Sequence, residues 1–179
     1  MMAAGRGVLG LFVGNRQAGG YFDFSQRGLA TSFIALLFVS ALSAAMPTIM
    51  NGGEGSIAGS LLIVAILFVL QLGFAVIVLR QLRRMDGFVP YLVADNWSTF
   101  FLSLISTAVV AAGFAGEFTL IVLGVIVILV RVNIARLIVT LSPIKIAMFL
   151  TAQLVGAAIG LLVIGFLFPV PPDATVPAV

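Results

Sequence analysis

Long apolar runs with few or no charges dominate this sequence. Five of them approach or exceed about 20 residues, the length that a helix needs to cross roughly 30 Å of bilayer hydrocarbon. They lie at positions 29–46, 57–79, 97–116, 118–140 and 147–168. Only 8% of the 179 residues are charged, whereas a soluble domain carries about 25% charged residues. The chain is therefore predicted to be an all-α protein, a polytopic transmembrane helical bundle with five spans.

Helices are the structure that suits these runs, because hydrocarbon offers no partner for an unpaired backbone group and the runs are about twice as long as barrel strands. The predicted transmembrane domain covers residues 29–168. A Gly-rich segment, residues 1–28, precedes it, and we expect that segment to lie at the inner membrane surface or to dock a partner, without a stable helix. A Pro-rich tail, residues 169–179, follows it and is predicted to be extended or disordered and external.

The start of the third run has two possible positions. Asp95 and Asn96 are preferred helix caps, and with either as the cap the helix begins at about Trp97. If Pro90 is instead the first helical residue, Asp95 lies inside the helix near the membrane surface. The predicted boundary is 97, and the earlier start stays open.

Arg131 interrupts the fourth run. Only 13 residues separate it from Glu117, about 20 Å of helix, so this helix must continue past the charge to span the bilayer. The favoured interpretation is an anchor whose guanidinium reaches the headgroups. The alternatives are a buried pair with Asp95 and an ion or substrate pathway. The candidate polar site consists of Asp95, Asn96, Arg131, Asn133 and Arg136.

The positions of the basic residues predict the orientation. They fall in three segments only: Arg6, Arg16 and Arg27; Arg80, Arg83 and Arg84; and Arg131, Arg136 and Lys145. Five spans place all nine on one side, with Glu54, Glu117 and Asp173 on the other. Because cytoplasmic loops are rich in Lys and Arg, the amino terminus is predicted to be cytoplasmic and the carboxy terminus external.

Small residues recur every four positions in the fifth run. Ala152, Gly156 and Gly160 would form a smooth helix face that allows close packing. We expect the partner helix to belong to the same chain, and a second stripe, formed by Ala108, Ala112 and Gly116, is the natural candidate. Association with another membrane protein or a second copy of the chain remains the alternative.

The amino-acid composition limits the kinds of reaction and binding site that this chain can support. The chain has no Cys and no His, which excludes disulfides, thiol chemistry and ordinary zinc or haem sites. No nucleophile has a base beside it in the sequence pattern, so we expect no enzyme, no cofactor, no metal and no nucleic-acid partner. Two function classes remain. The first, which the short loops and the lack of a catalytic constellation favour, is a non-enzymatic membrane scaffold or accessory protein that organises lipid or a partner protein. The second is a small transporter or channel subunit with a polar site near Asp95, Arg131 and Arg136.

The layout resembles the Yip (Ypt-interacting protein) family, which has a short cytoplasmic amino-terminal segment, five closely spaced spans and an external carboxy terminus. The Phe22-Asp23-Phe24-Ser25 entry to the first span and the Asp95-Asn96-Trp97 entry to the third are similar to features of small bacterial membrane proteins grouped with that family. The resemblance implies a membrane scaffold in a bacterial inner membrane. The amino-terminal motif of the GTPase-binding eukaryotic members has no copy here, so a GTPase partner is not implied.

Overall fold

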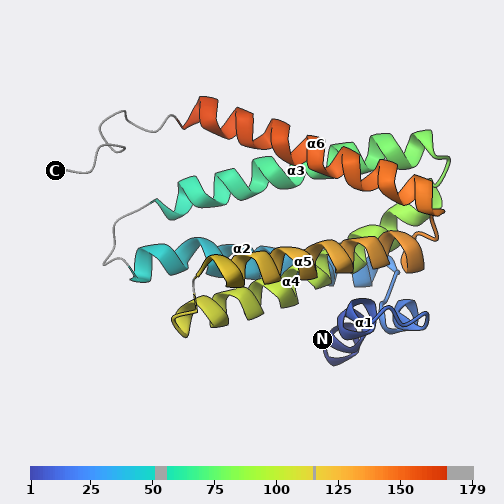
Figure 1. Ribbon diagram of the computed structural model, residues 1–179, viewed down its shortest axis with the longest axis horizontal. Helices are drawn as coiled ribbons and strands as arrows, with labels where there is room; N and C mark the ends of the chain where they lie inside the picture. The colour runs from blue at the N-terminus through green and yellow to red at the C-terminus, as the bar shows by residue number, and fades with distance from the viewer. Residues whose placement is uncertain (51–55, 115, 169–179) are drawn as a thin grey trace.

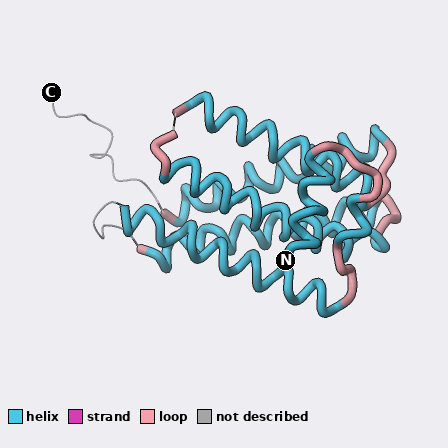
Figure 2. The backbone as a smooth tube through the Cα atoms, turned by 90° about the horizontal axis from the view of Figure 1, so that it is seen from below, coloured by secondary structure: helices cyan, strands magenta, loops and turns pink. Residues whose placement is uncertain are grey.

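The computed structural model describes residues 1–50, 56–114 and 116–168, and every regular element in that part of the chain is helical (Figures 1 and 2). The long helices are α2 (Gln26–Met50), α3 (Ile57–Gln81), α4 (Phe88–Ala111), α5 (Glu117–Asn133) and α6 (Pro143–Leu167). The short elements are α1 (Met2–Phe12), the 3₁₀ turns η1 (Ala18–Tyr21) and η2 (Met85–Gly87), and the π-helical segment η3 (Ile134–Ile138), which extends α5. Five of the described helices are long and apolar enough to cross a membrane, which indicates an integral membrane protein.

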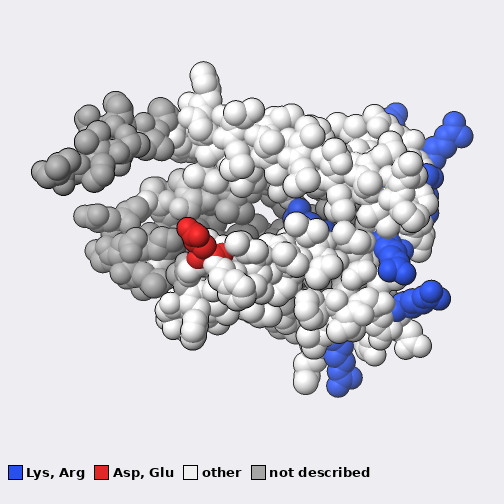
Figure 3. All heavy atoms as spheres, viewed as in Figure 1, with Lys and Arg blue, Asp and Glu red and all other residues white. Residues whose placement is uncertain are grey.

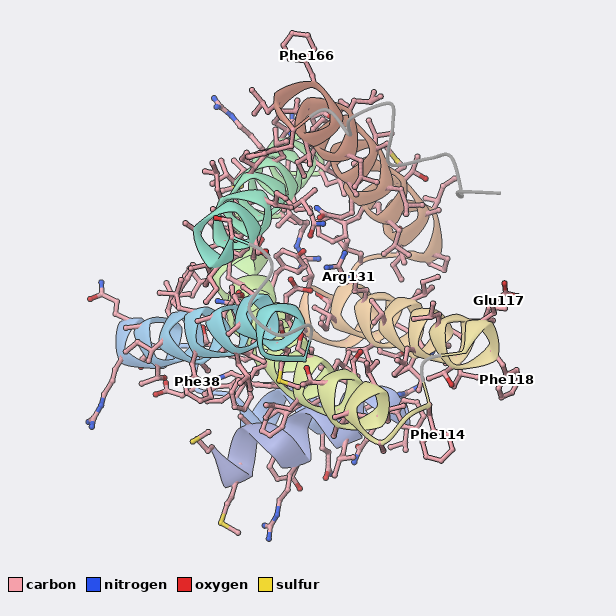
Figure 4. The ribbon with its side chains drawn as sticks, turned by 90° about the vertical axis from the view of Figure 1, so that its left-hand side faces the viewer. Phe38, Phe114, Glu117, Phe118, Arg131 and Phe166 are labelled. Atoms are coloured by element: carbon pink, nitrogen blue, oxygen red, sulfur yellow. The ribbon has the colours of Figure 1, made fainter. Side chains whose placement is uncertain are left out.

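The long helices form two units. Helix α3 packs most extensively on α6, and α2 on α4, with α5 beside α4 and α1 packed on both α4 and α5. Helix α2 also packs on α3, where the two units meet. Figure 1 shows the α3–α6 unit above the α2–α4–α5 unit, and the end-on view of Figure 4 shows the same division.

The core lies at the end of the bundle that carries the basic residues. Its fully buried side chains include Leu11 of α1, Leu79 of α3, Val93 of α4 and Ile134 of η3. In α4 the buried residues lie between Tyr91 and Phe100, so the half of the helix nearer its carboxy end contributes none. The basic end is therefore tightly packed, and the opposite end is open. Exposed Leu, Ile and Phe side chains there cost nothing in lipid, because hydrocarbon solvates them.

The prediction that residues 1–28 lack a stable helix is wrong. Helix α1 forms within this segment and buries Ala4, Val8 and Leu11. Glycines on α1 permit the close approach: a Cβ added at Gly7 would lie 2.7 Å from the Phe22 ring. Packing of the apolar face overrides the low helix propensity of glycine.

Residues 22–25, the segment that carries part of the family resemblance, form the entry turn of α2. Ser25 accepts a hydrogen bond from the Gly28 backbone N–H at 3.2 Å, and its own N–H donates to Asp23 Oδ1 at 3.0 Å. Hydrogen bonding with Ser25 lowers the pKa of the Asp23 carboxyl. Only glycine fits at position 28, where a Cβ would collide with the Asp23 carbonyl oxygen.

The predicted start of the third span at residue 97 is also wrong. Helix α4 begins at Phe88, so Asp95 and Asn96 lie two turns inside it and cap nothing. Pro90 is compatible with this start because the first turn of a helix has unpaired N–H groups in any case. The other boundaries shift less: α2 begins at Gln26, and α6 begins at Pro143 instead of residue 147.

The turn between η3 and α6 is hydrogen bonded to the loop that follows α3. Arg84 donates hydrogen bonds to the Val139 carbonyl at 2.6 Å and to the Thr140 carbonyl at 3.0 Å. Thr140 has a positive φ of 56°, which is unusual for a β-branched residue. The Arg84 bonds help to hold that strained turn and join the two helix units at the basic end.

The small-residue face of α6 packs within the chain, as predicted, but its partner is α3. A Cβ at Gly156 would lie 2.7 Å from Phe74 Cδ2, and one at Gly160 would lie 2.6 Å from Leu67 Cδ2. Ala152 packs against the core as well. The expected partner stripe of Ala108, Ala112 and Gly116 is wrong, because all three residues are exposed.

Two predicted segments lie outside the described residues: the loop that contains Glu54, and the Pro-rich tail 169–179.

The α3–α6 contact predicts a position-specific effect of Gly156→Ala. The added methyl would meet the Phe74 ring, and overpacking costs roughly 1–3 kcal/mol, more than the gain of about 1 kcal/mol in helix propensity. Gly165→Ala on the same helix is the control, because no atom lies within 4 Å of its added Cβ. Thermal unfolding in detergent should show a lower midpoint for Gly156→Ala than for Gly165→Ala. Equal midpoints would contradict the close packing.

Candidate functional site

Arg131 lies in the last turn of α5 and points into the bundle (Figure 4). Its Nε is 3.7 Å from Asp95 Oδ1 on α4, and its Nη2 donates a hydrogen bond to Gln71 Oε1 on α3 at 3.3 Å. The favoured sequence interpretation, a guanidinium that reaches the headgroups, is therefore wrong. The depth of Arg131 in the span does not by itself decide where its side chain points. The Asp95 carboxylate on the neighbouring helix does.

Asp95 can pair with Arg131 because α4 starts early. From two turns inside the helix its side chain faces α5, and 15% of that side chain is exposed, against 29% for Arg131. A carboxylate without a partner at this depth would cost several kcal/mol. The two opposite charges therefore compensate each other inside the membrane-spanning region.

Two glutamines extend the pair into the other helix unit. Besides accepting from Arg131, Gln71 offers its backbone carbonyl to Gln153 Nε2 on α6 at 3.4 Å. Neither glutamine belongs to the polar site predicted from the sequence. Their signal was present, because they are the only amide side chains in the runs 57–79 and 147–168, and polar side chains inside spans face the bundle interior.

A cavity of about 370 Å³ opens beside the pair, among α2, α3 and α4. Its walls are largely apolar, with Phe33, Leu37, Val64 and Phe68 among them. Its polar groups are Ser40, Gln71, Asp95, Asn96, Thr99 and Arg131. The lining extends along α2 and α3 toward the open end of the bundle, and the space-filling view is hollowed between the two units (Figure 3).

A second cavity of about 250 Å³ lies between α4 and α5. Hydroxyl groups line its α4 side: Ser98, Thr99, Ser103 and Ser106. Asp95, Thr99 and Arg131 line both cavities, so the ion pair stands where the two meet. The pair can therefore be approached from two directions.

Of the remaining members of the predicted polar site, Asn96 stays beside the pair in the lining of the larger cavity, whereas Asn133 and Arg136 lie elsewhere. Asn96 donates to Ser32 Oγ on α2 at 3.1 Å, and both residues are buried. Asn133 donates to the Leu11 carbonyl at 2.8 Å and so satisfies the carboxy end of α1. Arg136 is exposed on η3. Asn133 and Arg136 therefore lie outside the site, which contains Asp95, Asn96 and Arg131 with Gln71 and Thr99.

Several buried polar atoms near the pair have no hydrogen-bond partner among the described residues: Asn96 Oδ1, Ser98 Oγ and Gln153 Oε1. An unpaired buried polar atom costs about 1–3 kcal/mol, so such atoms are rare in folded proteins and ask for an explanation. Within the described chain no group of three or more His, Cys, Asp or Glu residues could hold a metal ion. The site therefore consists of an ion pair with hydrogen-bond donors and acceptors, surrounded mainly by apolar side chains. Such an arrangement is suited to binding a polar group.

Comparison of the chain with models of protein families, with characterised proteins and with solved structures finds no match. The resemblance to the Yip family therefore rests on the layout of the spans and the short segments named above.

The environment of the pair predicts a measurable coupling between Arg131 and Asp95. In a double-mutant cycle of Arg131→Ala and Asp95→Ala, each single variant leaves a charge uncompensated, so we expect the double variant to recover more than about 1 kcal/mol, beyond the range for exposed pairs. Chemical or thermal unfolding in detergent supplies the free energies.

The matched control for this cycle is the Arg84–Asp86 pair. Its atoms are closer, at 3.3 Å, but the Asp86 side chain is 69% exposed, so its coupling should stay below about 1 kcal/mol. If the coupling of Arg84 with Asp86 equals or exceeds that of Arg131 with Asp95, burial does not strengthen the inner pair.

Proposed function

We propose that this protein is a small membrane transporter or channel subunit whose substrate site lies at the Asp95–Arg131 pair. The observation that supports the proposal is the cavity of about 370 Å³ that reaches both charges. A scaffold that only organises lipid or a partner protein needs no cavity that reaches buried charges, and its inner charges would be packed and closed. The exposed position of Arg136 removes it from the proposed site.

The division into two helix units supplies a mechanism for this function. The hydrogen bond between Arg131 and Gln71 bridges the α2–α4–α5 unit and the α3–α6 unit beside the cavity. The Arg84 bonds join the same units at the basic end. A rotation of one unit about that packed end would widen or narrow the cavity and so change access to the pair.

For the orientation we propose a cytoplasmic amino terminus, an external carboxy terminus and location in a bacterial inner membrane. The basic side chains gather at the packed end of the bundle, and acidic atoms lie toward the other end on the face shown (Figure 3). The positive-inside rule then places the packed end in the cytoplasm and the open end outside. The larger cavity would accordingly open toward the exterior.

Fusion of a reporter enzyme that is active only outside the cytoplasm tests this orientation. A fusion after Val179 should be active, and one inserted between Arg80 and Asp86 should be silent, because the two points lie on opposite sides of the proposed topology. The reverse pattern would overturn the orientation, and equal activity at both points would overturn the number of spans.

The transporter proposal predicts that water reaches the cavity from outside. The chain has no Cys, so a single introduced thiol can be labelled without background. Ser40 lines the cavity, and the next residue, Ala41, is exposed on another face of α2 at nearly the same depth. A charged, membrane-impermeant methanethiosulfonate applied to intact cells should modify Ser40→Cys at least about tenfold faster than Ala41→Cys, because it reacts with a thiolate in water. Equal, slow labelling of both would favour the scaffold.

A further inference from the structure

The site at the junction of the two cavities carries no net formal charge. Of the described residues that line either cavity, Asp95 and Arg131 are the charged ones, and they are opposite in sign. Because this region lies inside a span, a ligand with a net charge would leave that charge uncompensated in a medium of low dielectric constant. The site therefore favours a ligand whose own charges sum to zero.

Both charges of the pair nevertheless retain unused hydrogen-bonding capacity. The separation of 3.7 Å between Nε and Oδ1 exceeds the roughly 2.7–2.9 Å of a charge-assisted hydrogen bond. Among the described residues Arg131 makes one side-chain hydrogen bond, to Gln71, and Asp95 accepts none. A guanidinium has five donors, so an anionic group can bind Arg131 while a cationic group binds Asp95.

The walls of the larger cavity indicate the chemistry of the part of the ligand that does not contact the ion pair. They are mostly Leu, Val and Phe side chains from α2 and α3, which suit an alkyl chain and not a polar body. The volume of about 370 Å³ lies near the lower end of the range for ligand pockets, roughly 300–1,000 Å³. That space suits one alkyl chain and is small for two.

From these observations we infer that the cavity binds a single-chain zwitterionic amphiphile, with its anionic group at Arg131, its ammonium group at Asp95 and its chain between α2 and α3. A lysophospholipid with an ethanolamine headgroup has this chemistry. The inference rests on the proposed function, because it assigns the substrate class of the same cavity.

Native mass spectrometry of the full chain, purified in a non-ionic detergent, tests the inference with three probes that share a similar alkyl chain. They are dodecanoyl-lysophosphatidylethanolamine, which is zwitterionic, dodecanoyl-lysophosphatidic acid, which is anionic, and dodecyltrimethylammonium, which is cationic. We expect the unaltered protein to bind the zwitterion at least about tenfold more tightly than either of the others, which corresponds to about 1.4 kcal/mol.

Variants that change the charge of the site should change this order in opposite directions. Asp95→Asn leaves a net positive site and should shift the preference toward the anionic probe. Arg131→Gln leaves a net negative site and should shift it toward the cationic probe. The controls make the same chemical changes on exposed side chains, Asp86→Asn and Arg136→Gln, and should leave the order of the probes unchanged.

The inference is overturned if the unaltered protein binds the anionic or cationic probe as tightly as the zwitterion, or binds none of the three. It is also overturned if the site variants and the controls shift the preference equally. The comparison of probes on the unaltered protein decides the matter even where a variant fails to fold. Labelling of Ser40→Cys reports separately on water access to the cavity. If the transporter proposal is correct and the inferred ligand class is wrong, labelling will be fast but the protein will not bind the zwitterion selectively.

Discussion

Hydrocarbon solvates neither a backbone amide nor a charged side chain. The helical fold of this protein and the polar contacts between its helices both follow from that constraint. Each long run pairs its own backbone by forming a helix. The polar side chains inside the runs must then find one another across helices, and four helices supply them: Asp95 from α4, Arg131 from α5, Gln71 from α3 and Gln153 from α6. The Arg131–Gln71 hydrogen bond links the two helix units in the middle of the bundle, and Gln153 extends the contact within the α3–α6 unit.

The same solvent explains why one end of the bundle is packed and the other open. In water, exposed apolar helices would close on each other to bury their surface. In lipid that driving force is absent, and helices stay together only where side chains interlock or hydrogen bond. At the basic end α1 and Arg84 supply such contacts, and the small residues of α6 supply them further along the α3–α6 contact. Beyond Phe100 α4 has few of them, and cavities can persist beside it.

The sequence predicts the five long helices well because hydropathy alone decides them. It failed where local signals compete with packing. Helix α1 was missed because its glycines lower helix propensity, although the same glycines allow it to pack against Phe22 and Phe101. Asp95 was placed at a helix cap because Asp is a preferred cap residue, so its pairing with Arg131 was predicted only as an alternative. Gln71 was missed because a single amide barely changes the hydropathy of a long run, and only the structure shows what it faces.

Arg131 contacts residues of both helix units, which matters if the two units move relative to each other. Its guanidinium contacts Asp95 within its own unit and Gln71 in the other, which the planar fork of an arginine permits and the single ammonium of a lysine serves less well. Separation of the units would break the bond to Gln71, at a cost of about 1.5–3 kcal/mol for a hydrogen bond to a charged group. The ion pair would stay together, because both partners lie in the same unit. The charge therefore remains compensated in either arrangement, and opening the cavity does not require an isolated charge inside the membrane.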